Sequence, residues 1–388
     1  MIGFSGYSIR LAFCTWFICS IWCVSLGQSF TVVYGGPLAE HGTGVVLNDT
    51  AVLVGTRTFE TGNYRARLDL RDLDGSSIIE TELDLMGTLF LQGMTPIPGG
   101  GAFLVGSHIA PDAHEHDGLL IRVGSDNSIS WVSHMDVPGD QQYYGVTALD
   151  DGGAMVCGVS DTSNGHDILV ARFDLTGALL WSVTEDGGLD DEAYAIASDA
   201  TGVVITGRQM NFGGTSDVVF MRFAMDGTLE WASGWGGSEN EIGRALVRTT
   251  DGNFLMAGTT ESYGAFDQTE NRFKKHVFLY AFNAVGDTLW TRAIGDTLFE
   301  RNVFCMDLAP NGDLLIGGER YVTTGTSDAM IQRLSSQGVL IWEHTIDEGK
   351  EEKLLDIHAL GDGLIATGWS FDDAGCKVLL LRRDEMGL

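Results

Sequence analysis

The strongest constraint on the fold of this chain is a pattern that returns about every 50 residues. Tryptophans recur, each shortly after a turn rich in Gly, Asp or Asn, at Trp131, Trp181, Trp231, Trp290 and Trp342. A glycine near the end of an apolar run recurs at a similar spacing, at Gly55, Gly106, Gly158, Gly207, Gly258, Gly318 and Gly368. Since self-similarity at a fixed period is the signature of a repeat fold, these glycines predict seven repeated units.

Each unit is predicted to fold as four short strands. In the fourth unit, strands are expected over Tyr194–Ser198, Val203–Gly207, Val218–Phe223 and Leu229–Ser233. The Asp, Asn and Gly residues between the strands tolerate the positive φ that tight hairpin turns require. Four strands in a period of about 50 residues are typical of a propeller blade. The sequence therefore predicts an all-β protein, a seven-bladed β-propeller of four-stranded antiparallel blades.

The two ends of the repeated region complement each other. The last unit has a third strand near Lys377–Arg382 and a turn, but no fourth strand after it. Phe30–Tyr34 aligns with the fourth strand Trp231–Trp235 of another unit. We therefore expect Phe30–Tyr34 to pair with Val378–Leu381 and to close the ring in the last blade. The recurring tryptophans are expected to fill the gaps between blades, and the glycines to permit close backbone approach.

The first 27 residues differ from the repeats. Arg10 is their only charged residue, and the apolar run Leu11–Leu26 precedes the small residue Gly27. This pattern predicts a signal peptide over residues 1–27 and a single propeller domain over residues 28–388. An uncleaved anchor helix is the alternative, but the apolar run is shorter than the roughly 20 residues that span a bilayer. The product is expected to be secreted, at the cell surface or in the periplasm, without membrane insertion after signal removal.

Cysteines and charge limit the chemistry further. Cys157, Cys305 and Cys376 follow the predicted signal peptide, and their odd number favours buried free thiols over a disulfide framework. With 23 basic and 53 acidic residues, the net charge is −30. This charge argues against nucleic-acid partners, because phosphates are bound by Lys and Arg. It permits cations or basic partners, or is simply a solvated acidic surface.

Binding is expected on the face that carries the long, irregular loops. The acidic connections there suggest calcium, because calcium prefers clustered hard oxygens. A polar loop of the second unit contains two histidines that could bind a transition metal. A solvated acidic rim and an ordinary polar loop are the alternatives. The weak metal-ligand candidates are Asp190, Asp191, Glu192, His114 and His116.

The longest insertion, between Gly258 and His276, is a candidate contact loop for a partner. It contains the one local group of basic residues, although a tolerated surface insertion is the alternative. Its candidate contact residues are Phe266, Phe273, Lys274 and Lys275.

Motifs of catalysis are missing from the sequence. It contains no Gly-x-Ser-x-Gly elbow, no His-Glu-x-x-His motif and no phosphate-binding loop. Asp174–Trp181 resembles the quinoprotein propeller repeat, but its Asp-to-Trp distance is one residue short, so shared blade mechanics explain it better. We predict no catalytic residue and no cofactor, with calcium as the one possible ligand.

Two segments carry a family resemblance. Leu180–Asp199 and Glu230–Glu241 resemble the bacterial secreted β-propeller repeat, which is typical of exported proteins of Bacteroidetes-type bacteria. The resemblance is clear over residues 115–388 and looser over residues 28–114. It implies the fold and export, and little about activity.

The leading hypothesis is an exported propeller that acts as a binding scaffold. Its partner would be an unknown protein or an extracellular polymer, bound on the long-loop face. Two alternatives stay open: a carbohydrate-active lyase or hydrolase with acidic residues at the central pocket, and a calcium-stabilised structural protein of the cell surface.

Overall fold

The computed structural model describes residues 29–36, 38–47, 51–60, 63–135, 137–162, 165–323 and 326–388. The predicted signal peptide therefore lies outside the described residues. The regular elements within the described residues are all β-strands. No helix in this part of the chain is long and apolar enough to cross a membrane.

Most strands belong to four-stranded antiparallel sheets, which we call blades. The first two separate blades are β2 (Ala39–Leu47), β3 (Val52–Glu60), β4 (Asn63–Arg71), β5 (Ser77–Glu82) and β6 (Thr88–Pro96), β7 (Ala102–Ile109), β8 (Asp117–Val123), β9 (Ile129–Met135). The next two are β10 (Gln141–Ala148), β11 (Ala154–Thr162), β12 (Gly165–Phe173), β13 (Leu179–Glu185) and β14 (Asp191–Ser198), β15 (Gly202–Met210), β16 (Ser216–Ala224), β17 (Leu229–Trp235). The fifth is β18 (Glu241–Arg248), β19 (Phe254–Thr260), β22 (His276–Phe282), β23 (Thr288–Ile294).

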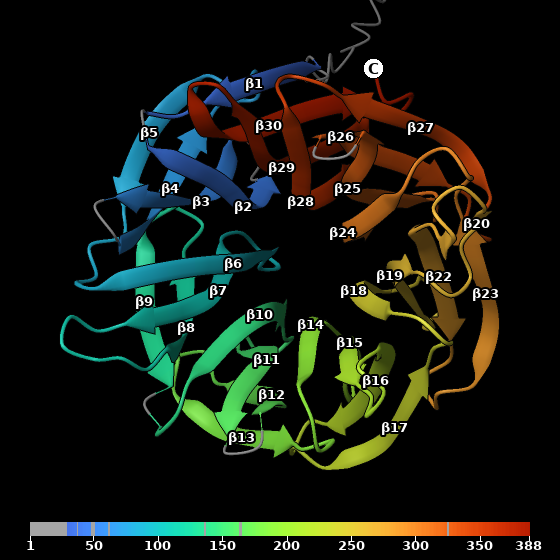
Figure 1. Ribbon diagram of the computed structural model, residues 1–388. Coiled ribbons are helices and arrows are strands. Elements are labelled where there is room, and N and C mark those ends of the chain that lie inside the picture. The colour runs from blue at the N-terminus through green and yellow to red at the C-terminus, as the bar shows by residue number, and fades with distance from the viewer. Residues whose placement is uncertain are drawn as a thin grey trace, which may run out of the picture.

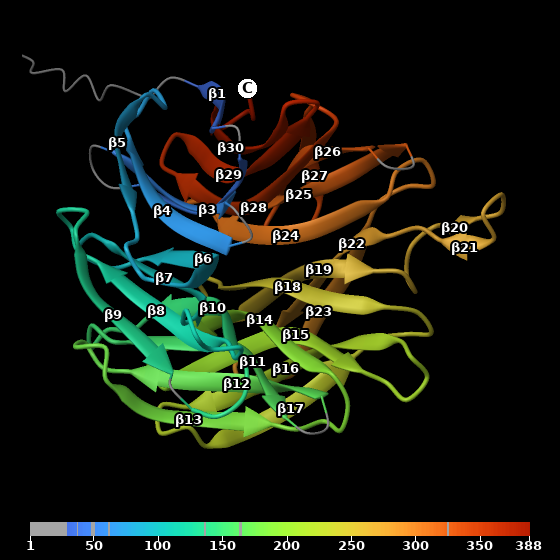
Figure 2. The ribbon, with the colours of Figure 1, turned by 60° about the vertical axis from the view of Figure 1, so that its left-hand side comes forward.

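The remaining large sheet has eight strands. One half is β24 (Arg301–Leu308), β25 (Leu314–Thr323), β26 (Thr326–Leu334) and β27 (Leu340–Ile346). The other half is β28 (Glu351–Leu360), β29 (Gly363–Asp372), β30 (Gly375–Asp384) and β1 (Phe30–Tyr34). A single parallel bridge between Ser327 and Glu351 joins the halves. A small hairpin of β20 (Phe266–Asp267) and β21 (Arg272–Phe273) projects from the fifth blade (Figure 2).

The blades stand radially around a central axis (Figure 1). The first strand of each blade, such as β6 or β10, lies innermost, and the fourth strand, such as β13 or β17, forms the outer rim. This is the arrangement of a β-propeller, as the repeat predicted. In the fourth unit the predicted strands are confirmed, and each is the same length or longer than expected.

The strand nearest the N-terminus pairs with the strand nearest the C-terminus. β1 runs antiparallel to β30, from Phe30 opposite Arg382 to Tyr34 opposite Val378. The predicted pairing of these two segments is therefore confirmed. Phe30 also contacts the β4–β5 turn, where a Cβ placed on Gly75 would lie 2.8 Å from its ring. The segment thus contacts both the last blade and the first.

The recurring tryptophans lie between blades, as predicted. Each indole packs against the glycine of the turn before the fourth strand of the next blade, as Trp131 does with Gly177. Three of the indole nitrogens also donate to a carbonyl in that turn at 3.0–3.1 Å: Trp131 to Leu175, Trp181 to Met225 and Trp231 to Ala284. Cys157, Cys305 and Cys376 are free and buried, as predicted.

The recurring glycines face an irregularity in the innermost strands. A Cβ on Gly158 would collide with the carbonyl oxygen of Gln142, at the point where β10 bulges away from β11. The same collision with the innermost strand occurs at Gly106, Gly207, Gly258, Gly318 and Gly368. Gly55 is the exception, because the nearest atom there would be 3.6 Å away. The predicted close backbone approach is thus what permits these bulges.

Candidate functional site in the central channel

Each bulge inserts one unpaired residue at the axis of the molecule. The register of every innermost strand skips one position where it pairs with its neighbour. The inserted residues line a central channel cavity of about 430 Å³. They are Thr43, Gln92, Tyr144, Tyr194, Arg244, Phe304 and Leu355. The fold therefore presents one chosen side chain per blade to the same cavity.

Three adjacent blades contribute a stacked series to this cavity. The rings of Tyr144 and Tyr194 stack with their centroids 5.6 Å apart and an interplanar angle of 27°. The guanidinium carbon of Arg244 lies 4.1 Å from the centroid of the Tyr194 ring. The Tyr194 hydroxyl donates to Glu192, which fixes the ring. This cation–π contact holds the guanidinium beside the Tyr194 ring.

Arg57 and Arg244 are the arginines among the residues that line the channel cavity. Among the described residues, no salt bridge joins Arg244 to an acidic side chain, nor Arg57, which also lines the cavity. Arg57 instead contacts the ring nitrogen of His41 at 3.1 Å. Burial lowers the pKa of Arg57. Arg57 lies on β3 of the first blade and Arg244 on β18 of the fifth, so the two guanidinium groups reach the channel from separate blades.

The channel wall formed by β24 and β28 contains a histidine between two aspartates. Nδ1 of His358 lies 3.4 Å from Asp307 and Nε2 lies 3.6 Å from Asp356. Asp307 accepts the backbone N–H of Ala359 at 2.8 Å, and Asp356 accepts that of Val45 at 2.9 Å. Burial lowers the pKa of His358, but the carboxylates of Asp356 and Asp307 outweigh burial and raise it to about 10. These acids are therefore engaged in joining β24, β28 and β2.

The predicted calcium candidates are placed close in sequence but not around one point. Asp190 accepts the N–H of His166 at 3.2 Å, and buried Asp191 accepts the N–H of Met210 at 3.2 Å. Glu192 forms an ion pair with Arg208 at 2.8 Å. Each carboxylate already has its own partner in a different direction.

The predicted histidine candidates are also separate. His116 is bonded to Ser107 at 2.9 Å and packs against Phe90, whereas His114 is exposed. Within the described residues, neither belongs to a group of potential metal ligands.

The insertion between Gly258 and His276 forms the projecting β20–β21 hairpin. Phe266 is 45% exposed and its ring meets Phe273 edge to face at 5.2 Å. Lys274 is buried and lies 2.8 Å from Glu270, and Lys275 lies 3.3 Å from Glu261. The lysines are thus neutralised, so the hairpin offers aromatic surface rather than free positive charge.

Residues of the channel were missed by the sequence analysis. The signal was present, since Tyr144, Tyr194 and Arg244 each lie about 13 or 14 residues before the recurring glycine of their own unit. If side chains alternated regularly along the strand, nothing would distinguish these residues from their neighbours. Only the bulge turns them toward the axis.

Comparisons with known proteins agree on the fold. No protein-family model and no curated protein matches the chain. A solved protein of unknown function from Dyadobacter fermentans matches with a TM-score of 0.53 at 9% identity, over 77% of this chain and 96% of that one. The periplasmic gluconolactonase of Pseudomonas aeruginosa matches with a TM-score of 0.50 at 13% identity, over 88% and 94% of the two chains. The β-propeller domain of the trilobed protease from Pyrococcus furiosus matches with a TM-score of 0.50 at 9% identity, over 91% and 93%. At these identities the similarity concerns the fold, and the chain is a β-propeller.

Proposed function

We propose that this protein is an exported binding scaffold whose central channel holds the acidic end of an extracellular polymer. The observation that carries the proposal is Arg244, a guanidinium in the channel with no carboxylate partner among the described residues. The sequence analysis favoured the long-loop face, whereas the channel combines a cavity, aromatic walls and a charge available to a ligand.

The chemistry of the ligand follows from the wall of the channel. A free guanidinium forms charge-assisted, often bidentate hydrogen bonds with a carboxylate or sulfate group. The stacked rings of Tyr144 and Tyr194 supply a flat apolar surface beside it. Pockets of about 300–1,000 Å³ with apolar walls and few polar groups are typical ligand sites. An acidic sugar has both features, an anionic group and a flat apolar face.

The architecture that supports this site is part of the same proposal. We take the chain as a ring of seven blades, closed where β1 completes the sheet of β28–β30, with residues 1–27 as a cleaved signal peptide. The β1–β30 pairing and the contact of Phe30 with the first blade support closure. Export agrees with a polymer ligand outside the cytoplasm.

The proposal is tested by calorimetric titration with a galacturonate trimer and with a neutral galactose trimer. We expect the acidic trimer alone to bind. Arg244→Gln should weaken its binding about 10-fold or more, because a hydrogen bond to a charged group contributes roughly 1.5–3 kcal/mol. Arg248→Gln is the matched control, since Arg248 lies on the same strand, is exposed and does not line the channel.

Two results would contradict the proposal. One is equal binding of the neutral and acidic trimers, or of neither. The other is an Arg244→Gln protein that binds the acidic trimer as tightly as the wild-type protein does.

A further inference from the structure

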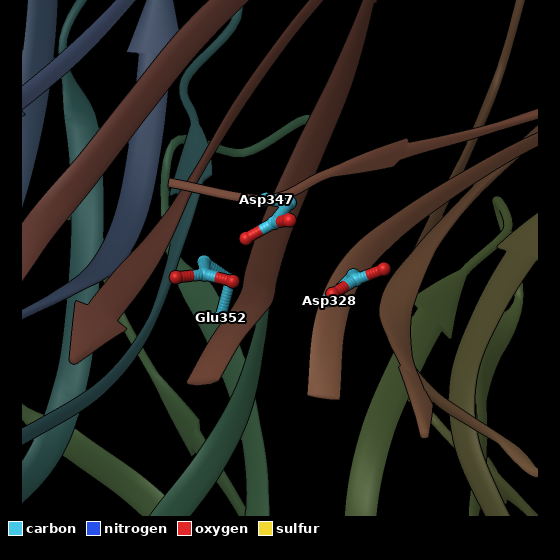
Figure 3. A group of neighbouring side chains, drawn as sticks. All are labelled: Asp328, Asp347 and Glu352. Atoms are coloured by element: carbon cyan, nitrogen blue, oxygen red, sulfur yellow. The ribbon is translucent and has the colours of Figure 1, made fainter. Parts of the chain in front are cut away.

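Three carboxylates from successive elements meet where β26 and β28 approach. Asp328 lies on β26, Asp347 follows β27, and Glu352 lies on β28. One oxygen of each lies within 4.8 Å of the others, and the three groups face one another (Figure 3). Among the described residues, this is the one such group of possible metal ligands.

Glu352 is the anchor of this group and lacks a full set of partners. It is 0% exposed. Its Oε1 accepts the hydroxyl of Ser370 at 3.0 Å, but its Oε2 is buried without a hydrogen-bond partner among the described residues. Burying a carboxylate oxygen without a partner is costly, so this atom requires a ligand that the protein's side chains do not provide.

The equivalent residues of other blades show what is missing. Glu40 and Glu241 occupy the same place on their innermost strands as Glu352. Glu40 accepts the N–H of Gly36 at 3.1 Å, and Glu241 accepts the N–H of Gly237 at 2.7 Å. In the loop before β28 the corresponding residue is Glu348 instead of glycine. In two blades a loop N–H donates to this carboxylate. In the last blade the carboxylate of Glu352 instead lies beside those of Asp328 and Asp347.

The charge of the group is not balanced by nearby cations. Among the described residues, Arg320 is the basic side chain that contacts it, 3.4 Å from Asp328, and Arg320 also lies 3.5 Å from Glu343. The site therefore has an excess of negative charge around a buried oxygen.

We propose that Asp328, Asp347 and Glu352 bind one calcium ion. Calcium–oxygen distances of about 2.3–2.6 Å place opposed ligands about 4.6–5.2 Å apart, so three oxygens within 4.8 Å fit around one ion. Magnesium, with distances of about 2.0–2.1 Å, needs a tighter octahedron. The exposed side of Asp347 leaves room for water ligands. The ion ties β26 to β28 beside the single bridge between Ser327 and Glu351.

Calcium titration of the chelator-treated protein tests this site, followed by calorimetry and by thermal unfolding. We expect one ion per chain and a higher Tm with calcium. Asp347→Asn and Glu352→Gln should each weaken calcium binding at least 10-fold. Without calcium, Glu352→Gln should melt at the same temperature as the wild-type protein or above it, because the substitution removes an unsatisfied buried charge. That reversal separates loss of a ligand from a folding defect.

Asp186→Asn is the matched control. Asp186 lies eight residues before the inserted residue of β14, as Asp347 does before that of β28, and it accepts the N–H of Gly188 at 2.6 Å. Calcium binding should be unchanged in this variant. An unchanged melt at millimolar calcium would overturn the proposal, as would equal calcium binding by the wild-type, Asp347→Asn and Glu352→Gln proteins. Tighter binding of magnesium than of calcium would also overturn it.

Discussion

His358 is placed to make the stability of the propeller depend on pH. It lies between Asp307 of β24 and Asp356 of β28, and Asp356 in turn accepts a backbone N–H of β2. Its pKa of about 10 in the folded protein lies above the ordinary value of 6.5. A pKa raised on folding stabilises the folded state fully below pH 6.5, and that stabilisation is lost as the pH rises through 10.

The magnitude follows from the same two values. At about 1.4 kcal/mol per pKa unit, protonated His358 contributes roughly 4 kcal/mol to the free energy of unfolding at pH 7, and less than about 1 kcal/mol near pH 10.5. His358→Gln should therefore be destabilised by roughly 3–4 kcal/mol at pH 7. The difference from the wild-type protein should shrink almost to nothing at pH 10.5.

Urea unfolding of both proteins from pH 6 to 10.5, followed by tryptophan fluorescence, measures this difference. Comparing the two proteins cancels the tyrosines and cysteines, which titrate in both. His114→Gln is the control, because His114 is exposed and its loss should leave stability unchanged at every pH. A difference between wild-type and His358→Gln proteins that stays constant over this range would refute the reasoning.

Two further predictions concern the ring itself. Gly207→Ala should lower the free energy of unfolding by at least about 2 kcal/mol, because its Cβ would collide with the Glu192 carbonyl. Gly213→Ala is the control: no atom lies within 4 Å of its Cβ, so it should change the free energy of unfolding by less than about 0.5 kcal/mol. Equal effects of the two substitutions in urea unfolding would contradict the role of Gly207 at the bulge. A protein that begins at Gly35 loses β1 and should lose at least about 3 kcal/mol, since apolar side chains of β1 leave their contacts. A synthetic peptide of residues 29–34 should restore the lost stability. Undiminished stability of the shortened chain would show that the pairing of β1 with β30 does not stabilise the fold.

The fold could be predicted from the sequence because equivalent positions of the repeated units make similar packing contacts and therefore need similar residues. A tryptophan packs at five of the junctions between blades, and a glycine faces the bulge of each innermost strand, so both recur visibly in the sequence. The pairing of Phe30–Tyr34 with the last unit could be predicted for the same reason, because this segment resembles the fourth strand of another unit.

The sites were harder to predict because they depend on neighbours that are distant in sequence. Adjacent acids such as Asp190, Asp191 and Glu192 look like a cluster, but successive side chains of a strand point to opposite faces. Asp328 and Glu352 belong to different repeats and meet only across a blade junction. Lys274 appeared as a free positive charge, and the turn of the β20–β21 hairpin then brought Glu270 beside it.

The inserted residues of the innermost strands have a consequence for how such a protein can change. An inserted side chain has no cross-strand partner, so its replacement leaves the pairing of the other residues in the ladder unchanged. Evolution or design can therefore alter the lining of the axis one blade at a time, exchanging a tyrosine for a glutamine or an arginine, while the folding of the sheets continues under the control of other positions.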